Sequence, residues 1–173
     1  FKFQFLRQNL EYKKFMYPEY QKVAQFFSTA RDLLSTSLTM KDIYEFATSK
    51  EHKRNNAVTT LNEKGRPVSY NYNQYKIKTH EMASKLANFV GNLEKDQVIA
   101  LKIKNSPNWV HAFWSILMNG FRPLLIDARL PKENTENLIK QSHAVAIVTG
   151  EISTYSVTTI NIDELNQSKP QLL

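Results

Sequence analysis

The fold of this chain is decided by residues 98–120, which read VIALKIKNSPNWVHAFWSILMNG. The run Val98–Ile103 is almost continuously apolar, as expected for a strand that is buried on both faces of a sheet. Ser106 and Pro107 then supply a side-chain cap and a proline for the first helical position. Apolar residues spaced three and four apart predict a helix that ends near Gly120. The stretch therefore predicts a strand followed by a helix, which is half of a βαβ unit.

The helix predicted after Ser106 has one apolar side, which we expect to straddle its contact with the sheet. That side consists of Trp109, Val110, Phe113, Ile116 and Leu117. Trp109 and Trp114 lie five positions apart and cannot share a face well, so we expect one of them in the core and the other at its rim.

The same alternation continues towards the end of the chain. Short apolar runs predict strands at Leu124–Ile126, Ala144–Val148 and Val157–Ile162. Pro131 opens a helix that continues through Leu138 and Ile139. Strands that alternate with helices are typical of βαβ units and a mainly parallel sheet.

A hairpin and a long helix precede the parallel part. Strands are predicted at Ala57–Leu61 and Arg66–Tyr70, around turn residues 62–65 whose Gly65 tolerates positive φ. The next helix carries apolar positions in steps of four and three, and Gly91 stands at its expected C-terminal cap. Those positions are Tyr75, Thr79, Met82, Leu86, Phe89 or Val90, and Leu93.

The N-terminal part of the chain reads as helical. A helix is expected over residues 12–34, and Thr39 is a suitable N-cap for a second helix, Met40–Thr48, which would bury Ile43, Tyr44 and either Phe46 or Ala47. We therefore predict an N-terminal helical arm over residues 1–50. Residues 51–173 would form an α/β subdomain with helices on both faces of a mainly parallel sheet, preceded by the β-hairpin.

Composition excludes several kinds of function. The 173 residues include no Cys, so a disulfide framework, a thiolate zinc site and a cysteine nucleophile are excluded. No apolar run approaches the roughly 20 residues of a membrane span. The opening residues 1–6 lack the long apolar centre and small-residue cleavage site of a signal peptide, and we expect a cytoplasmic protein. The net charge is +7. The basic residues form no stripe with interleaved aromatics, and we expect no nucleic-acid partner.

The order of residues from Ala57 onward resembles the N-terminal region of the adenylate-forming (AMP-binding) superfamily, which includes acyl-CoA synthetases, adenylation domains of peptide synthetases and luciferases. The family reads roughly Gly-Asp-x-Val-Ala-Leu and then Pro-Asn-Ser-Pro-Glu before a helix. This chain has comparable residues at 95–101 and 104–109. Weaker similarities, in the family's order, lie at residues 71–75, 82–83, 112–120, 125–131 and 146–149.

The resemblance covers about two thirds of the chain. Lys104, Leu125 and Ala128 stand where the family usually has proline, which weakens any assignment to a subfamily. Residues 1–38 match no motif of the family.

The resemblance implies part of an AMP-forming acid–thiol ligase. The intact enzyme would join a carboxylic acid to AMP, with ATP and Mg²⁺, and then pass the acyl group to CoA or a carrier protein. Fatty acid metabolism is one setting for such an enzyme. The family's Ser/Thr/Gly-rich phosphate loop, its adenine site and its catalytic lysine lie beyond residue 173, so this part alone is expected to be inactive. The sequence does not reveal which carboxylic acid is used.

No catalytic, cofactor-binding or metal-binding residue is therefore assigned in this part of the chain. Four glycines, none close together, cannot form a phosphate-cradling loop. No two of the histidines have metal-binding spacing, and we interpret them as packed or surface residues. Carboxylates at residues 94, 96, 163 and 164 are interpreted as solvated. Asp127 follows a predicted strand and is interpreted as orienting a turn.

Two other interpretations stay open. The chain could be a non-catalytic interaction module derived from the same fold, docking a partner through its aromatic N-terminal helices. Six Phe residues in the arm favour self-association or contact with downstream domains of the same enzyme. They are Phe1, Phe3, Phe5, Phe15, Phe26 and Phe27. Packing of the arm back onto its own sheet is an equal alternative. The third interpretation, a nucleic-acid-binding domain, rests on net charge alone.

Overall fold

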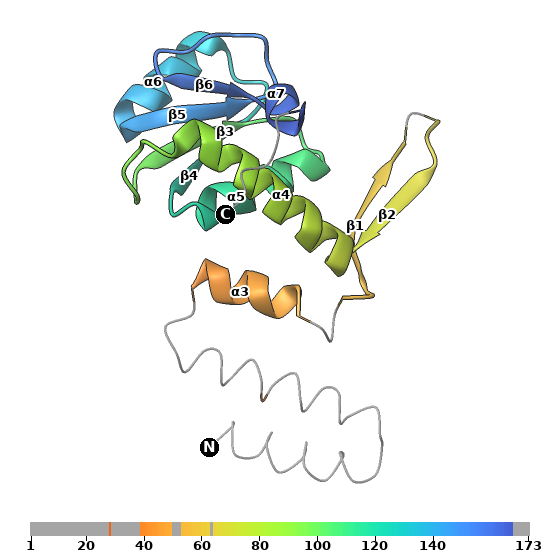
Figure 1. Ribbon diagram of the computed structural model, residues 1–173. Helices are drawn as coiled ribbons and strands as arrows, with labels where there is room; N and C mark the ends of the chain where they lie inside the picture. The colour runs from red at the N-terminus through yellow and green to blue at the C-terminus, as the bar shows by residue number, and fades with distance from the viewer. Residues whose placement is uncertain (1–27, 29–38, 50–52, 63, 168–173) are drawn as a thin grey trace, which may run out of the picture. The chain divides into compact units, whose positions relative to one another are not determined.

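The computed structural model of the chain describes residues 28, 39–49, 53–62 and 64–167 (Figure 1). The chain divides into two compact units, Phe1–Ile43 and Tyr44–Leu173. The helix predicted over residues 12–34 and the six Phe residues of the arm lie outside the described residues, and the boundary near residue 50 stays a prediction. Among the described residues, none of the helices has both the length and the hydropathy that crossing a bilayer requires.

Helix α3 (Met40–Ala47) begins at the predicted cap. Thr39 Oγ1 accepts a hydrogen bond from the backbone N–H of Asp42 at 3.2 Å, and the Asp42 carboxylate accepts one from the Thr39 N–H at 2.8 Å. This exchange satisfies N–H groups that a helix start leaves without partners. Tyr44 is buried as predicted. Ile43 is 41% exposed, so its predicted burial is wrong. Consecutive helical residues lie about 100° apart around the axis, and the buried side of α3 that includes Tyr44 does not extend as far as Ile43.

The predicted hairpin is present as β1 (Asn56–Leu61) and β2 (Pro67–Asn71), paired antiparallel. Gly65 has a φ of 70°, which confirms the prediction of a positive φ in this turn. Glycine adopts such a φ without strain because it has no Cβ atom. Asn62 Oδ1 accepts hydrogen bonds from the N–H groups of Lys64 and Arg66, at 3.0 and 2.9 Å. The turn is therefore held by one side chain as well as by the backbone.

Helix α4 (Tyr72–Val90) starts with a capping box in which Asn71 and Gln74 accept hydrogen bonds from each other's backbone N–H. Its predicted apolar stripe is confirmed from Tyr75 to Leu86, with Val90 rather than Phe89 at its end. Gly91 is the C-cap residue, but its φ of −59° is helical. A left-handed conformation is therefore not the reason for glycine at this position.

Four strands form the parallel sheet: β3 (Val98–Lys102), β4 (Arg122–Leu125), β5 (Ala144–Thr149) and β6 (Thr158–Asn161). Their order is β4-β3-β5-β6, with every neighbouring pair parallel. Helix α5 (Pro107–Met118) connects β3 to β4, α6 (Lys132–Ser142) connects β4 to β5, and α7 (Ile162–Gln167) follows β6. The α/β class predicted from the sequence is confirmed.

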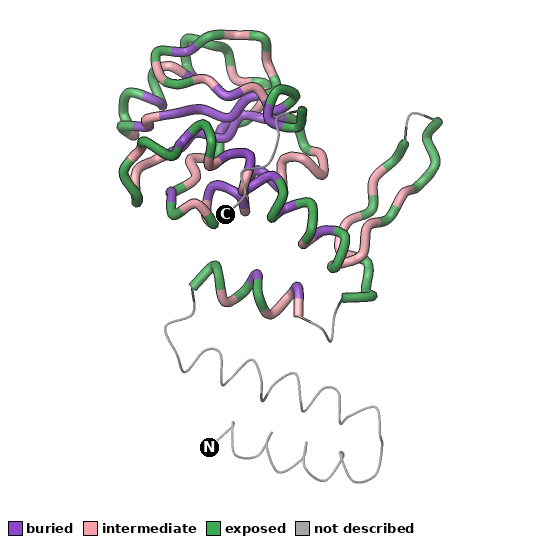
Figure 2. Tube along the Cα trace, viewed as in Figure 1, coloured by how far each residue is buried: buried purple, intermediate pink, exposed green. Residues whose placement is uncertain are grey.

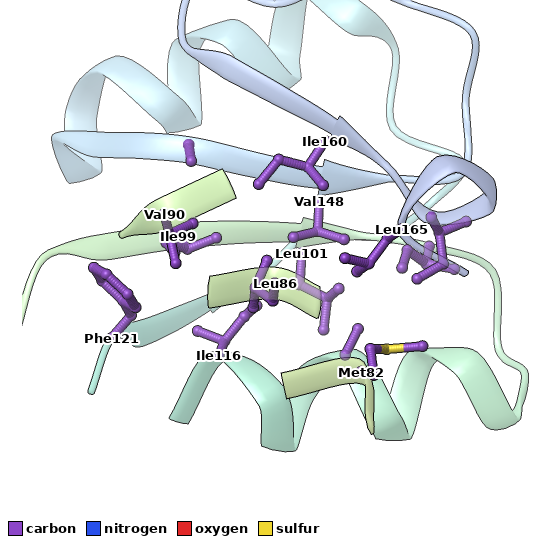
Figure 3. Close-up of a cluster of buried hydrophobic side chains, with 14 residues drawn as sticks. Met82, Leu86, Val90, Ile99, Leu101, Ile116, Phe121, Val148, Ile160 and Leu165 are labelled. Atoms are coloured by element: carbon purple, nitrogen blue, oxygen red, sulfur yellow. The ribbon is translucent and has the colours of Figure 1, made fainter. Parts of the chain in front are cut away.

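Each face of the sheet has its own apolar core. Helices α4, α5 and α7 cover one face, where Leu86, Ile116 and Leu165 meet strand residues that include Leu101 and Val148 (Figure 3). Helix α6 covers the other face. There Ile139 and Tyr155 pack with a smaller set of buried residues, Ala100, Ile126, Ala144 and Ile147. Figure 2 shows that burial concentrates on the strands and on the helix sides that face them.

The buried side of α5 differs from the predicted one. Ile116 is fully buried as expected, and Trp109 and Phe113 are only half-buried against the core. The other buried residues of α5 are His111, Ala112 and Ser115. The helix packs extensively on α4 as well as on the sheet, and small residues such as Ala112 and Ser115 let two helices approach closely. Hydrophobicity alone therefore predicted part of the buried side and missed its small and polar residues.

Candidate functional site

The strand order creates a topological switch point between β3 and β5. The segment after β3 leads to α5 on one face of the sheet, whereas the loop after β5 carries Tyr155 into the core on the α6 face. In open α/β sheets, ligands bind outside the carboxyl ends of strands at such a point. The side chains at the ends of β3 and β5 are therefore the first place to look for a functional site.

A cluster of charged and polar side chains fills this position; we call Lys102, Glu151 and Tyr155 the Lys102 cluster. Lys102 is the last residue of β3 and pairs with Thr149, the last residue of β5. Its Nζ donates to both Glu151 oxygens, at 2.8 and 2.9 Å, and lies 3.3 Å from the Tyr155 hydroxyl. The Tyr155 O–H donates to Glu151 Oε2 at 2.9 Å. Two donors thus converge on one carboxylate.

Burial makes this cluster unusual. The Lys102 side chain is 1% exposed, whereas that of Glu151 is 39% exposed. Burial works to lower the pKa of Lys102, but the hydrogen bonds to Glu151 and Tyr155 outweigh it, and the pKa is raised. The hydrogen bond from Lys102 lowers the pKa of Glu151 in turn. Both groups are therefore charged at neutral pH.

The loop between β5 and β6 brings the cluster together. The N–H of Glu151 donates to Thr149 Oγ1 at 3.1 Å, which fixes the start of the loop. The Tyr155 N–H donates to Thr159 Oγ1 at 3.0 Å, and the Ser156 N–H donates to Glu136 of α6 at 2.9 Å. Hydroxyls at the ends of the two strands thus hold the loop in the position that the Lys102–Glu151 pair requires.

A second buried polar group joins α4 to α5. Thr79 Oγ1 donates to the Tyr75 carbonyl at 2.9 Å and lies 2.8 Å from His111 Nδ1. Burial, with a smaller effect from the charge of Lys78, lowers the pKa of His111 to about 4. His111 is therefore a neutral packing residue, in agreement with its interpretation from the sequence.

The other residues that the sequence analysis singled out cap helices or hold turns. Ser106 Oγ accepts a hydrogen bond from the Trp109 N–H at the start of α5, and Gly120, with a φ of 80°, follows its end. Asp127 accepts the N–H of Arg129 at 2.8 Å and pairs with its guanidinium at 2.7 Å, and these contacts lower the pKa of Asp127 to about 2. The arrangement orients a turn, as interpreted from the sequence. His143 is an exposed, left-handed C-cap.

The residues present do not fit ATP or Mg²⁺. Within the described part of the chain, no three His, Asp or Glu side chains gather closely enough to hold a metal ion. The chain's four glycines stand apart in the sequence, so no loop brings several bare N–H groups to a triphosphate. No catalytic step can be derived from these side chains.

Comparison with known proteins settles the family. The sequence model described as AMP-binding enzyme matches residues 46–172. The chain belongs to this family. The match spans the hairpin, the parallel sheet and all four helices from α4 to α7, in agreement with the resemblance seen in the sequence. Comparison with curated proteins gives no match.

Solved structures share the fold at low identity. The N-terminal subdomain of NpsA from Klebsiella oxytoca, in complex with 3-hydroxybenzoyl-AMSN, is 17% identical with a TM-score of 0.63, covering 77% of this chain and 32% of that one. O-Succinylbenzoate coenzyme A synthetase (MenE) from Bacillus subtilis, in complex with ATP and a magnesium ion, is 18% identical with a TM-score of 0.55, covering 61% of this chain and 30% of that one.

A third similar structure is multidomain. NpsA-ThdA, an artificially fused adenylation–PCP di-domain from Klebsiella oxytoca, is 16% identical with a TM-score of 0.64, covering 75% of this chain and 23% of that one. The chain thus spans a third or less of the length of these solved proteins.

Sequence reasoning missed the Lys102 cluster. One signal was available, because Lys102 interrupts a run that is otherwise apolar from Val98 to Ile103 and that predicts burial on both faces. A lysine in such a strand needs a partner. The partners, Glu151 and Tyr155, lie about fifty residues further along the chain, and only the pairing of β3 with β5 brings them near.

Proposed function

We propose that this chain is the N-terminal part of an ATP-dependent carboxylate-activating ligase. The intact protein would form an acyl-adenylate with release of pyrophosphate and then transfer the acyl group to a thiol, either CoA or a carrier protein. The observation that carries the proposal is the family match over residues 46–172, joined to a sheet with the expected order of elements.

The role of this part in that reaction is architectural. Its described residues supply two apolar cores and a four-stranded parallel sheet, while the glycine-poor sequence offers no loop for a triphosphate. We infer that the groups that hold ATP and Mg²⁺ belong to the remaining two thirds of such an enzyme. CoA and carrier protein are equal candidates for the acyl acceptor, and fatty acids are one class of acid to test.

Trapping of the acyl-adenylate tests the proposal. The gene is expressed through to its stop codon, and the purified protein is incubated with ATP, Mg²⁺, hydroxylamine and a panel of fatty, aromatic and amino acids. The expected result is acyl-hydroxamate with at least one class of acid, together with release of pyrophosphate. A folded protein that yields neither product with any acid would favour the non-catalytic interaction module.

A further inference from the structure

Two further lysines lie close to parts of the Lys102 cluster. Besides Lys102, the charge of Lys104 contributes to the lowered pKa of Glu151. Lys132, at the start of α6, places its Nζ 5.9 Å from the centre of the Tyr155 ring. Between described side chains, neither Lys104 nor Lys132 forms an ion pair. Lys104 thus adds to the positive charge that acts on Glu151. Lys132 lies near the Tyr155 ring, where the neighbouring Ser156 is bonded to the carboxylate of Glu136.

The donors of the cluster are fixed, whereas the acceptor is able to move. Lys102 is held within the central strand and Tyr155 is 9% exposed within the second core. Glu151 instead belongs to the loop after β5, follows Gly150 and keeps 39% of its side chain exposed. A rotation of its χ angles would take its carboxylate into water at little cost in packing. Lys102 Nζ and the Tyr155 O–H would then both need another acceptor.

We propose that the Lys102 cluster is an oxyanion site for a phosphate group, and that Glu151 closes this site until a phosphate-bearing ligand displaces its carboxylate. The donors that hold the two Glu151 oxygens suit phosphate oxygens equally well. The ammonium group of Lys104, which acts on Glu151 together with that of Lys102, favours a phosphate dianion over a second carboxylate. The position at the carboxyl ends of β3 and β5 is the one at which parallel α/β sheets bind ligands.

This inference does not rest on the proposed function. It concerns side chains of β3, the β5–β6 loop and α6, and it needs neither a glycine-rich loop nor acyl-adenylate chemistry. An inactive chain could bind phosphate here, and an active enzyme could lack this site.

The test is a titration of the full ¹⁵N-labelled chain with sodium phosphate at constant ionic strength, followed through the amide signals of Gly150, Glu151 and Tyr155. Glu151→Gln removes the competing charge and keeps the shape of the side chain. Lys102→Met removes the buried donor. Lys140→Gln is the matched control, because it removes one positive charge from the last turn of α6, at the opposite edge of the sheet.

Removing the negative charge of Glu151 is expected to tighten the binding of phosphate. Glu151→Gln binds phosphate at least about fivefold more tightly than the unmodified chain, because no carboxylate has to be displaced first. Lys102→Met abolishes saturable shifts, and Lys140→Gln leaves affinity unchanged. A parallel titration with AMP distinguishes a phosphate ester from free phosphate, and tighter binding of either ligand by Glu151→Gln supports the site.

Three results would overturn it: no tighter binding of either ligand by Glu151→Gln, equal losses in Lys102→Met and Lys140→Gln, or shifts that do not include the β5–β6 loop. The comparison of Glu151→Gln with the unmodified chain decides the matter even where Lys102→Met fails to fold.

Discussion

The face of the sheet under α4, α5 and α7 and the face under α6 receive different side chains from the same strands. On β3, Ile99 and Leu101 belong to the first core, as does Ile103 just after the strand. Ala100 belongs to the second core, and Lys102 alternates to that side. The strand side chains buried on the first face are apolar. The second ends, at the carboxyl edge of the sheet, in a buried charge. The comparison indicates that the first face mainly stabilises the fold, whereas the second ends in the Lys102 cluster, which we propose as a ligand site.

The largest effect is expected in the first core. Ile116 is fully buried there, and Ile116→Ala should lower the free energy of unfolding by about 2–5 kcal/mol. Its neighbour Leu117 is half-buried, so Leu117→Ala should cost less than about 1.5 kcal/mol. Urea denaturation of both variants measures the difference. Equal losses would show that α5 is rotated from the register described.

The polar contact between α4 and α5 should make the apolar face sensitive to acid. The pKa of His111 falls from 6.5 to about 4 on folding, so the native state binds fewer protons than the unfolded chain between these values. Above pH 6.5 this group does not reduce the free energy of unfolding. As the pH falls from 6.5 to below 4, the cost of keeping His111 uncharged in the folded state lowers the free energy of unfolding by up to about 3 kcal/mol. His111→Gln should flatten that part of the pH–stability curve, measured by urea melts. Parallel curves would contradict the assignment.

The Lys102 cluster should respond differently to the loss of each partner. Glu151→Gln leaves a buried ammonium without its countercharge and should cost about 1–2 kcal/mol, reduced from the cost of a fully buried pair because Glu151 is partly hydrated. Lys102→Met should cost less, since it removes the buried charge and keeps an unbranched side chain, while Glu151 can be solvated. Thermal unfolding ranks the two variants. The reverse order would mean that Lys102 is not desolvated.

The smallest effect concerns the helix starts on the two faces. Ser106 caps α5 on the first face, whereas α6 begins at Pro131 without a side-chain cap. Ser106→Ala should therefore cost about 1 kcal/mol. Pro131→Ala removes no cap hydrogen bond and serves as the control in the same denaturation series. A change below a few tenths of a kcal/mol for Ser106→Ala would show that water replaces the cap.

The sequence predicted the features that depend on near neighbours. Caps at Thr39 and Ser106, the Asn62–Gly65 turn and the stripe of α4 follow from spacings of three or four residues, and each is confirmed. The buried side of α5 was predicted only in part: Ile116, Trp109 and Phe113 meet the first core, but the small and polar residues that contact α4 were missed, because a hydrophobic pattern ignores them. The Lys102 cluster was missed because its partners meet only through strand pairing.

We propose that this chain supplies part of the scaffold of an adenylate-forming enzyme and that the groups that activate the acid lie in the rest of that enzyme. Exchange of labelled pyrophosphate into ATP, measured on the purified 173-residue chain with Mg²⁺ and a panel of fatty, aromatic and amino acids, tests it most directly. The account predicts no exchange above the protein-free background with any acid. Exchange that depends on one acid and rises in proportion to chain concentration would contradict it.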